Sequence, residues 1–151
     1  MAPAAQPDAF SLELNYWGHP RLGWRIGADG EGEFRAADPP SSGIVQEYAL
    51  VTRRFNAGEA GFQEIRALMD RAARLTAPTM PCRKVAYDQV YGRANWHRGA
   101  RSVGINFDFG CGNRVAQQVM GLLGEATTLI QGWASNQPIV ETQQIRGPAP
   151  E

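Results

Sequence analysis

The sequence predicts an α+β domain, with an antiparallel sheet of about five to six strands and two helices packed on one face. Period-two alternation of apolar residues, as in FSLELNY at 10–16, indicates strands, and two longer stripes of period 3.6 indicate helices. The 151 residues suit one domain, which we assign to residues 10–146. Residues 1–9 are expected to form a flexible leader and residues 147–151 a flexible tail.

The segment before the first helix is expected to contain several strands. After the strand at 10–16, Asp29-Gly30 lies between two apolar runs, which is a strong signal for a hairpin turn. The composition of ADPPSSG at 37–43 predicts a loop, and a further strand is expected within 45–55. Asn56 and Glu59 then have the spacing of an N-terminal capping box. They precede an apolar helical stripe formed by Phe62, Ile65, Met69 and Ala72.

The second half of the chain repeats the order of strands and then a helix. VAYDQVY at 85–91 and RANWHR at 93–98 are expected to be short strands, and RSVGINFDF at 101–109 a longer one. The stripe at 113–134 predicts the second helix, although three glycines within it weaken helix formation by about 1 kcal/mol each. The tail QPIVETQQI at 137–145 is expected to add an edge strand.

A short internal similarity suggests a ββα-type duplication. FNAGEAGF and FDFGCGNR both place Phe-[Asn/Asp]-x-Gly where a strand is expected to lead into a helix. The alignment makes Asp108 the counterpart of Asn56 and leaves Cys111 opposite Glu59.

The composition excludes several classes of protein. Fifteen basic and fifteen acidic residues cancel, so the whole chain has no electric field that would attract nucleic acid or an anionic membrane. No run approaches the ~18 apolar residues of a transmembrane helix, and MAPAAQPDAF lacks the features of a signal peptide. Fourteen of the basic residues are Arg, and together with abundant Ala, Gly and Pro this suggests a GC-rich bacterial genome.

Cys111 supports two competing interpretations. At a strand-to-helix turn, the helix dipole would favour a thiolate, so Cys111 could be a nucleophile with His97 as base and Asp108 as orienting acid. Alternatively, Cys111 forms a disulfide with Cys82, which would stabilise the fold by about 3–4 kcal/mol in an oxidising compartment. Two free, buried thiols are the third possibility. The sequence leaves these alternatives open.

Other constellations of polar residues are weaker. His19, His97, Asp88 and the two cysteines lack the spacings of a metal site, and no pattern indicates a cofactor. YGRANWHRGAR at 91–101 interleaves aromatic residues with arginines, as single-stranded nucleic acid sites do. On a strand the same pattern gives one apolar and one solvated face, and we therefore expect no nucleic acid partner.

The best binding candidates are aromatic and histidine side chains near predicted strand ends. If they are exposed, such residues are typical hot spots for a partner or ligand. These candidates are Tyr16, Trp17, His19, Trp24, Tyr91 and Trp96. In the alternative interpretation the tryptophans cover one end of the core.

RRFNAGEAGFQEIRALM, Cys82 followed by Asp88 and Tyr91-Gly92, and FDFGC resemble segments of small bacterial α+β proteins to which no activity is assigned. Such proteins are often exported, so the resemblance implies a periplasmic rather than a cytoplasmic location, and it transfers no functional residues. We therefore expect a non-enzymatic binding or accessory domain whose partner is another protein or a small ligand. The alternatives are a thiol-dependent enzyme centred on Cys111 and an inhibitor or immunity-like protein.

Overall fold

A computed structural model describes residues 7–38, 47–76 and 82–145 of the chain. The predicted leader, loop and tail lie largely outside these residues, although Ala9, Ala37 and Asp38 belong to strands. The element order is β1 (Ala9–Tyr16), β2 (His19–Gly27), β3 (Glu31–Asp38), β4 (Tyr48–Asn56), α1 (Gly58–Thr76), β5 (Tyr91–Arg98), β6 (Arg101–Asp108), α2 (Arg114–Ala134) and β7 (Ile139–Ile145).

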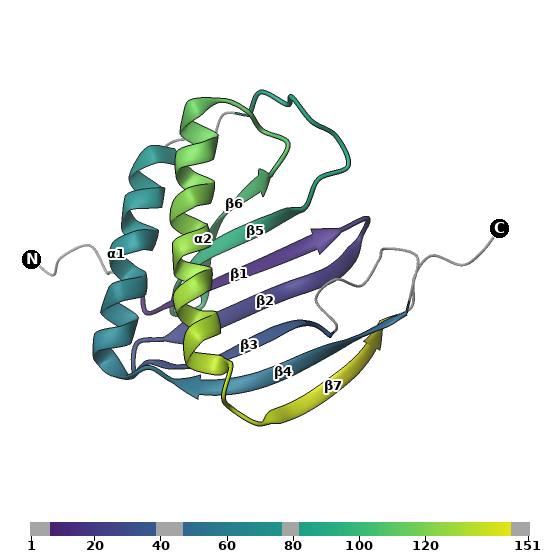
Figure 1. The fold of residues 1–151 in the computed structure, drawn as a ribbon. Helices are drawn as coiled ribbons and strands as arrows, with labels where there is room; N and C mark the ends of the chain where they lie inside the picture. Colours follow the sequence, from purple (N-terminus) through teal and green to yellow (C-terminus); the bar gives the residue numbers. More distant parts are fainter. Residues whose placement is uncertain (1–6, 39–46, 77–81, 146–151) are drawn as a thin grey trace, which may run out of the picture.

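The seven strands form one antiparallel sheet in the order β6-β5-β1-β2-β3-β4-β7 (Figure 1). The prediction of an α+β fold with an antiparallel sheet is confirmed, and the strand number is higher than expected. The predicted C-terminal edge strand is present as β7, which pairs with β4 from Tyr48↔Ile145 onward. Its side chains are exposed except for Ile145, so β7 is attached by backbone pairing more than by burial of apolar surface.

The strand register gathers the large apolar side chains on one face of the sheet. Phe10 lies opposite Ile26 on β2 and opposite Trp96 on β5, and Trp24 lies opposite Phe34. Because side chains alternate along a strand, this register turns the polar residues between them to the other face.

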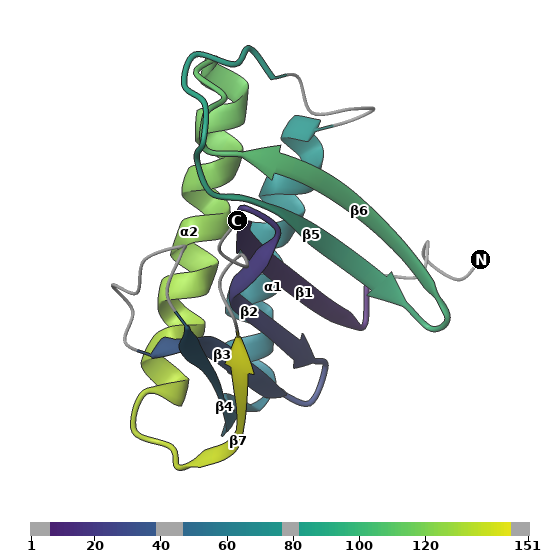
Figure 2. The same ribbon diagram turned by 90° about the vertical axis from the view of Figure 1, so that its right-hand side faces the viewer.

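Both helices lie over the apolar face, as Figures 1 and 2 show from two directions. Phe62 of α1 stacks on Phe10 with ring centroids 5.3 Å apart, and Trp24 donates its indole N–H to Thr127 Oγ1 of α2. Trp96 donates its indole N–H to the Met69 carbonyl of α1. These bonds satisfy the one polar atom of each buried indole.

Trp24 and Trp96 therefore differ from the expectation that they are binding residues. Their exposed fractions are 4% and 9%. The alternation that placed them on strands was correct, but the helices cover the face to which they point. They belong to the core, as the alternative interpretation held.

The two strand-to-helix junctions share a local structure. Asn56 Oδ1 accepts a hydrogen bond from Gly58 N at 2.9 Å, and Asp108 Oδ1 accepts one from Gly110 N at 2.6 Å. The proposed correspondence of Asp108 with Asn56 thus has a structural basis in one shared hydrogen bond, which the backbone N–H two residues later donates to the side-chain oxygen of each residue. The surrounding elements do not repeat, because four strands precede α1 and two lie between α1 and α2.

The segment 82–90 corrects the prediction of a strand at 85–91. Strand β5 begins only at Tyr91, and the preceding segment makes a single antiparallel bridge, Lys84↔Cys111. The backbone of Val85 and Ala86 donates to the Gly110 carbonyl instead of to a neighbouring strand. The apolar alternation in VAYDQVY therefore belongs mainly to an irregular segment with largely exposed side chains. Local periodicity does not distinguish such a segment from a half-buried strand.

Candidate functional site

Three exposed aromatic side chains, Trp17, Tyr87 and Tyr91, lie at the end of the molecule where the β1–β2 turn meets segment 82–90. Their exposed fractions are 56%, 71% and 37%. Trp17 and Tyr91 line a pocket of about 230 Å³, which we call the aromatic pocket. Its complete lining is Trp17, Lys84, Asp88, Gln89, Tyr91 and Asp108.

The β1–β2 turn holds Trp17 in an uncommon conformation. The φ angles of Trp17 and Gly18 are 52° and 77°, as a tight hairpin turn requires. Asn, Asp or Gly usually occupies the first of these positions, and a bulky residue there is strained. The turn is tied to β5 because Gly18 N donates a hydrogen bond of 3.0 Å to the Tyr91 hydroxyl oxygen.

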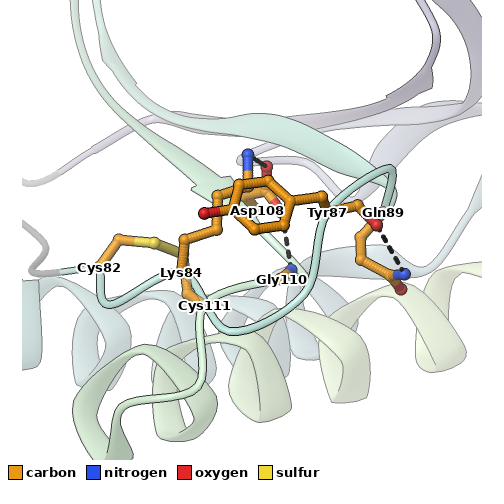
Figure 3. Close-up of polar contacts among 7 residues, drawn as sticks. All are labelled: Cys82, Lys84, Tyr87, Gln89, Asp108, Gly110 and Cys111. Atoms are coloured by element: carbon orange, nitrogen blue, oxygen red, sulfur yellow. Dashed lines mark hydrogen bonds and ion pairs between the residues drawn. A yellow bond between two sulfur atoms is a disulfide. The ribbon is translucent and has the colours of Figure 1, made fainter.

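Lys84 and Asp108, which both line the aromatic pocket, form an ion pair with each other, as Figure 3 shows. Lys84 Nζ lies 3.2 Å from Asp108 Oδ2 and 5.3 Å from the centre of the Tyr87 ring. Asp108 Oδ1 is held by Gly110 N, so the carboxylate is fixed from two sides. A lysine ammonium between a carboxylate and an aromatic ring gains both Coulomb and cation–π attraction.

Asp88 lines the same pocket with a carboxylate that makes no hydrogen bond or ion pair within residues 7–38, 47–76 and 82–145. Its φ is 57°. Asp tolerates this left-handed region better than most residues. The neighbouring Gln89 donates from Nε2 to the Tyr87 carbonyl at 3.2 Å, which closes the turn around Asp88.

The Cys82–Cys111 pair anchors segment 82–90 to the start of α2. The two residues are paired as a disulfide, with Cα atoms 5.1 Å apart across a sequence separation of 29 (Figure 3). Gly112 N donates to the Arg83 carbonyl at 2.8 Å, and Arg83 N donates to Asn113 Oδ1 at 3.0 Å. The aromatic pocket is therefore built on a cross-linked segment.

The structure does not assemble the predicted thiol site. Cys111 is 3% exposed and its sulfur is bonded to Cys82, so it carries no thiolate in this form. His97 lies opposite Ser102 near the β5–β6 turn, whereas Asp108 lies opposite Tyr91 at the other end of the same two strands. Six residues of strand separate these positions, about 20 Å. His97 is too far away to act as the base.

His97 has a different partner on the uncovered face of the sheet. Its Nε2 lies 2.7 Å from Ser11 Oγ. Burial, assisted by the charge of Arg25 and opposed by that of Asp8, holds the pKa of His97 below its ordinary range. Asp8 uses Oδ2 to accept from Gly99 N, so it does not orient the imidazole as a catalytic acid would.

A shallow groove of about 260 Å³ runs beside this Ser–His contact on the same face. Its floor includes Gly23, whose missing side chain leaves room for the Arg35 guanidinium. Glu33 in its wall pairs with Arg54 at 3.4 Å. With alternating acidic and basic side chains, the groove has the character of a solvated sheet face.

Tyr16 and His19 close the β1–β2 hairpin opposite each other and are half-buried. They flank Trp17 in sequence but do not line the aromatic pocket. Within the described segments, no three His, Cys, Asp or Glu side chains are placed to hold a metal ion. No helix in those segments has the length and apolarity needed to cross a membrane.

Sequence reasoning identified Trp17 and Tyr91 and missed Lys84, Tyr87 and Asp88 as a group. Tyr87 and Asp88 lie in the segment 85–91 that was predicted to be a strand, where alternation puts neighbouring residues on opposite faces, and Lys84 directly precedes it. No protein-family model and no curated protein matches the chain.

Proposed function

We propose that this protein is a non-enzymatic binding domain that recognises another protein through the aromatic pocket and the adjacent Tyr87. The observation that carries this proposal is Trp17, a large ring left 56% exposed on a turn where it strains the backbone. Strained backbone that persists at one place is a common mark of a functional site.

The chemistry of the exposed side chains supports a protein partner. Trp and Tyr are enriched among the residues that dominate binding energy at interfaces, because each buries a large area at a low entropic cost. The pocket of about 230 Å³ is smaller than the ~300–1,000 Å³ typical of small-molecule sites. It fits the end of one side chain of a partner better than a whole ligand.

The rigidity of this surface supports the same proposal. Segment 82–90 is cross-linked by the disulfide, and the β1–β2 turn is bonded to Tyr91. Loops ordered before binding lose less conformational entropy when the complex forms. A disulfide persists in an oxidising compartment, and we therefore place the protein in the bacterial periplasm or outside the cell.

Site-specific photocrosslinking tests the proposal. A benzophenone amino acid replaces Tyr87 in one variant and Gln131, which is exposed on α2, in a control variant. In extracts of the cells that produce the protein, we expect a discrete crosslinked partner from position 87 and none of the same mass from position 131. Excess unlabelled protein should suppress the crosslink, whereas excess Trp17→Asn protein should not. Equal suppression by both competitors would refute the proposed surface.

A further inference from the structure

We propose that the aromatic pocket receives a basic side chain of the partner, an ammonium or guanidinium group, between Trp17 and Tyr91 on one side and Asp88 on the other. This inference rests on the proposed function and specifies what the partner must present.

The lining of the pocket combines the two chemical groups that attract an organic cation. Trp17 and Tyr91 supply aromatic rings, whose faces carry negative electrostatic potential. Asp88 and Asp108 supply carboxylates. Aromatic faces attract Lys, Arg and quaternary ammonium groups, and a nearby carboxylate adds Coulomb attraction to the same cation.

Lys84 already demonstrates this chemistry within the molecule. Its ammonium lies 3.2 Å from Asp108 and 5.3 Å from the centre of the Tyr87 ring (Figure 3). An incoming cation would find the same two kinds of group in the lining of the pocket, the carboxylate of Asp88 and the rings of Trp17 and Tyr91. In this pocket Asp108 therefore already has a cation as its partner, and Asp88 is the carboxylate to which a second cation could bind.

The charges of the pocket favour one more positive group. Lys84 neutralises Asp108, and Asp88 makes no hydrogen bond or ion pair in the parts of the chain that the structure describes. A partner anion would meet Asp88 without a compensating cation. A metal ion would have the Lys84 ammonium as a neighbour and one free carboxylate as ligand. An organic cation meets neither difficulty.

Titration followed by nuclear magnetic resonance tests this assignment with defined probes. The amides of N-acetylarginine and N-acetyllysine are added to the ¹⁵N-labelled protein, with N-acetylcitrulline amide as the neutral analogue of arginine and NaCl matching the ionic strength. The Trp17 indole signal is assigned by its loss in Trp17→Asn. We expect saturable shifts of this signal and of the Asp88 and Tyr91 amides with arginine or lysine, and none with citrulline. The ratio of the two affinities distinguishes guanidinium from ammonium recognition.

Three variants separate recognition of charge from an effect on folding. Asp88→Asn removes the charge but keeps a residue that tolerates positive φ, and it should weaken binding of the cationic probe by about two- to fivefold. Lys84→Gln removes the competing ammonium and should tighten binding by a similar factor. Glu125→Gln, which removes an exposed charge on α2, is the matched control and should change nothing.

Equal shifts with citrulline amide, or shifts in Asp88→Asn protein of the same affinity as in wild type, would overturn the inference. Absence of saturable shifts with every cationic probe would also overturn it. A partner crosslinked at position 87 in the absence of cation binding would leave the proposed function standing and remove only this inference. Cation binding without a crosslinked partner would support the preference of the pocket for cations and would count against the proposed protein-binding function.

Discussion

Trp17 and Asp88 come from distant parts of the chain, line one pocket, and are the two non-glycine residues with positive φ among those the structure describes. The other positive φ angles, at Gly18, Gly30, Gly58 and Gly99, belong to residues that adopt this conformation readily. These two positions thus belong to the pocket that holds exposed aromatic rings and Asp88, a carboxylate with no hydrogen bond or ion pair among the described residues.

Replacement of Trp17 distinguishes a binding role of its side chain from a structural role. Trp17→Asn creates Asn-Gly, the favoured pair for this turn, while it removes the contacts of a half-exposed ring. We expect the free energy of unfolding in urea to remain within about 1 kcal/mol of wild type, because these two effects oppose each other. Partner binding should be lost in the same variant. A loss of stability of several kcal/mol would instead indicate that the ring is structural.

The disulfide closes a long loop and should contribute strongly to stability. For the Cys82–Cys111 sequence separation of 29, the chain-entropy argument gives about 3–4 kcal/mol. Urea unfolding with and without a dithiol reductant measures this difference. The Cys82→Ser/Cys111→Ala double variant is the control and should not respond to the reductant. Two thiols that react in denaturant before reduction would contradict the disulfide.

Exposed glycines in α2 offer a simple stability test. A Cβ at Gly124 meets no atom within 4 Å, so Gly124→Ala should raise the free energy of unfolding by about 1 kcal/mol through helix propensity. Gly30→Ala is the contrasting variant, because a Cβ there would overlap the backbone of Gly58 and Gly30 has a φ of 88°. It should destabilise the protein in the same thermal or urea measurement. Equal responses of the two variants would contradict the close approach of Gly30 to the Gly58 backbone.

Stability should fall as the pH falls below the ordinary pKa of histidine. Burial, and then Arg25, lower the pKa of His97 in the folded protein. The unfolded chain therefore binds a proton at a higher pH, near 6.5, and stability is lost as pH decreases through that value toward the lower folded pKa. Between about pH 7.5 and 5.5, the free energy of unfolding of wild type should therefore fall more than that of His97→Asn, which has no imidazole to protonate at this position. A constant difference would show that His97 titrates normally.

Local pattern predicted most of the elements correctly. The second helix was expected at 113–134 and spans Arg114–Ala134, and the strand at 10–16 is β1 with one residue added. Amphipathic periodicity is informative here because burial on one face imposes it directly on the residue order. The same signal misassigned 85–90, where apolar residues recur although the segment lies before β5 begins at Tyr91.

Residue patterns were enough to predict the α+β class, both helices, most of the antiparallel strands and a short list of residues that contained Trp17, Tyr91 and the Cys82–Cys111 pair. Which aromatic residues are buried became known from the fold, since α1 and α2 cover one sheet face and enclose Trp24 and Trp96 in the core. The fold also brings Trp17 and Asp88 into the lining of one pocket and places His97 far from Cys111. The physical reason is that strand register and helix placement depend on contacts between residues distant in sequence, which periodicity within one segment does not encode.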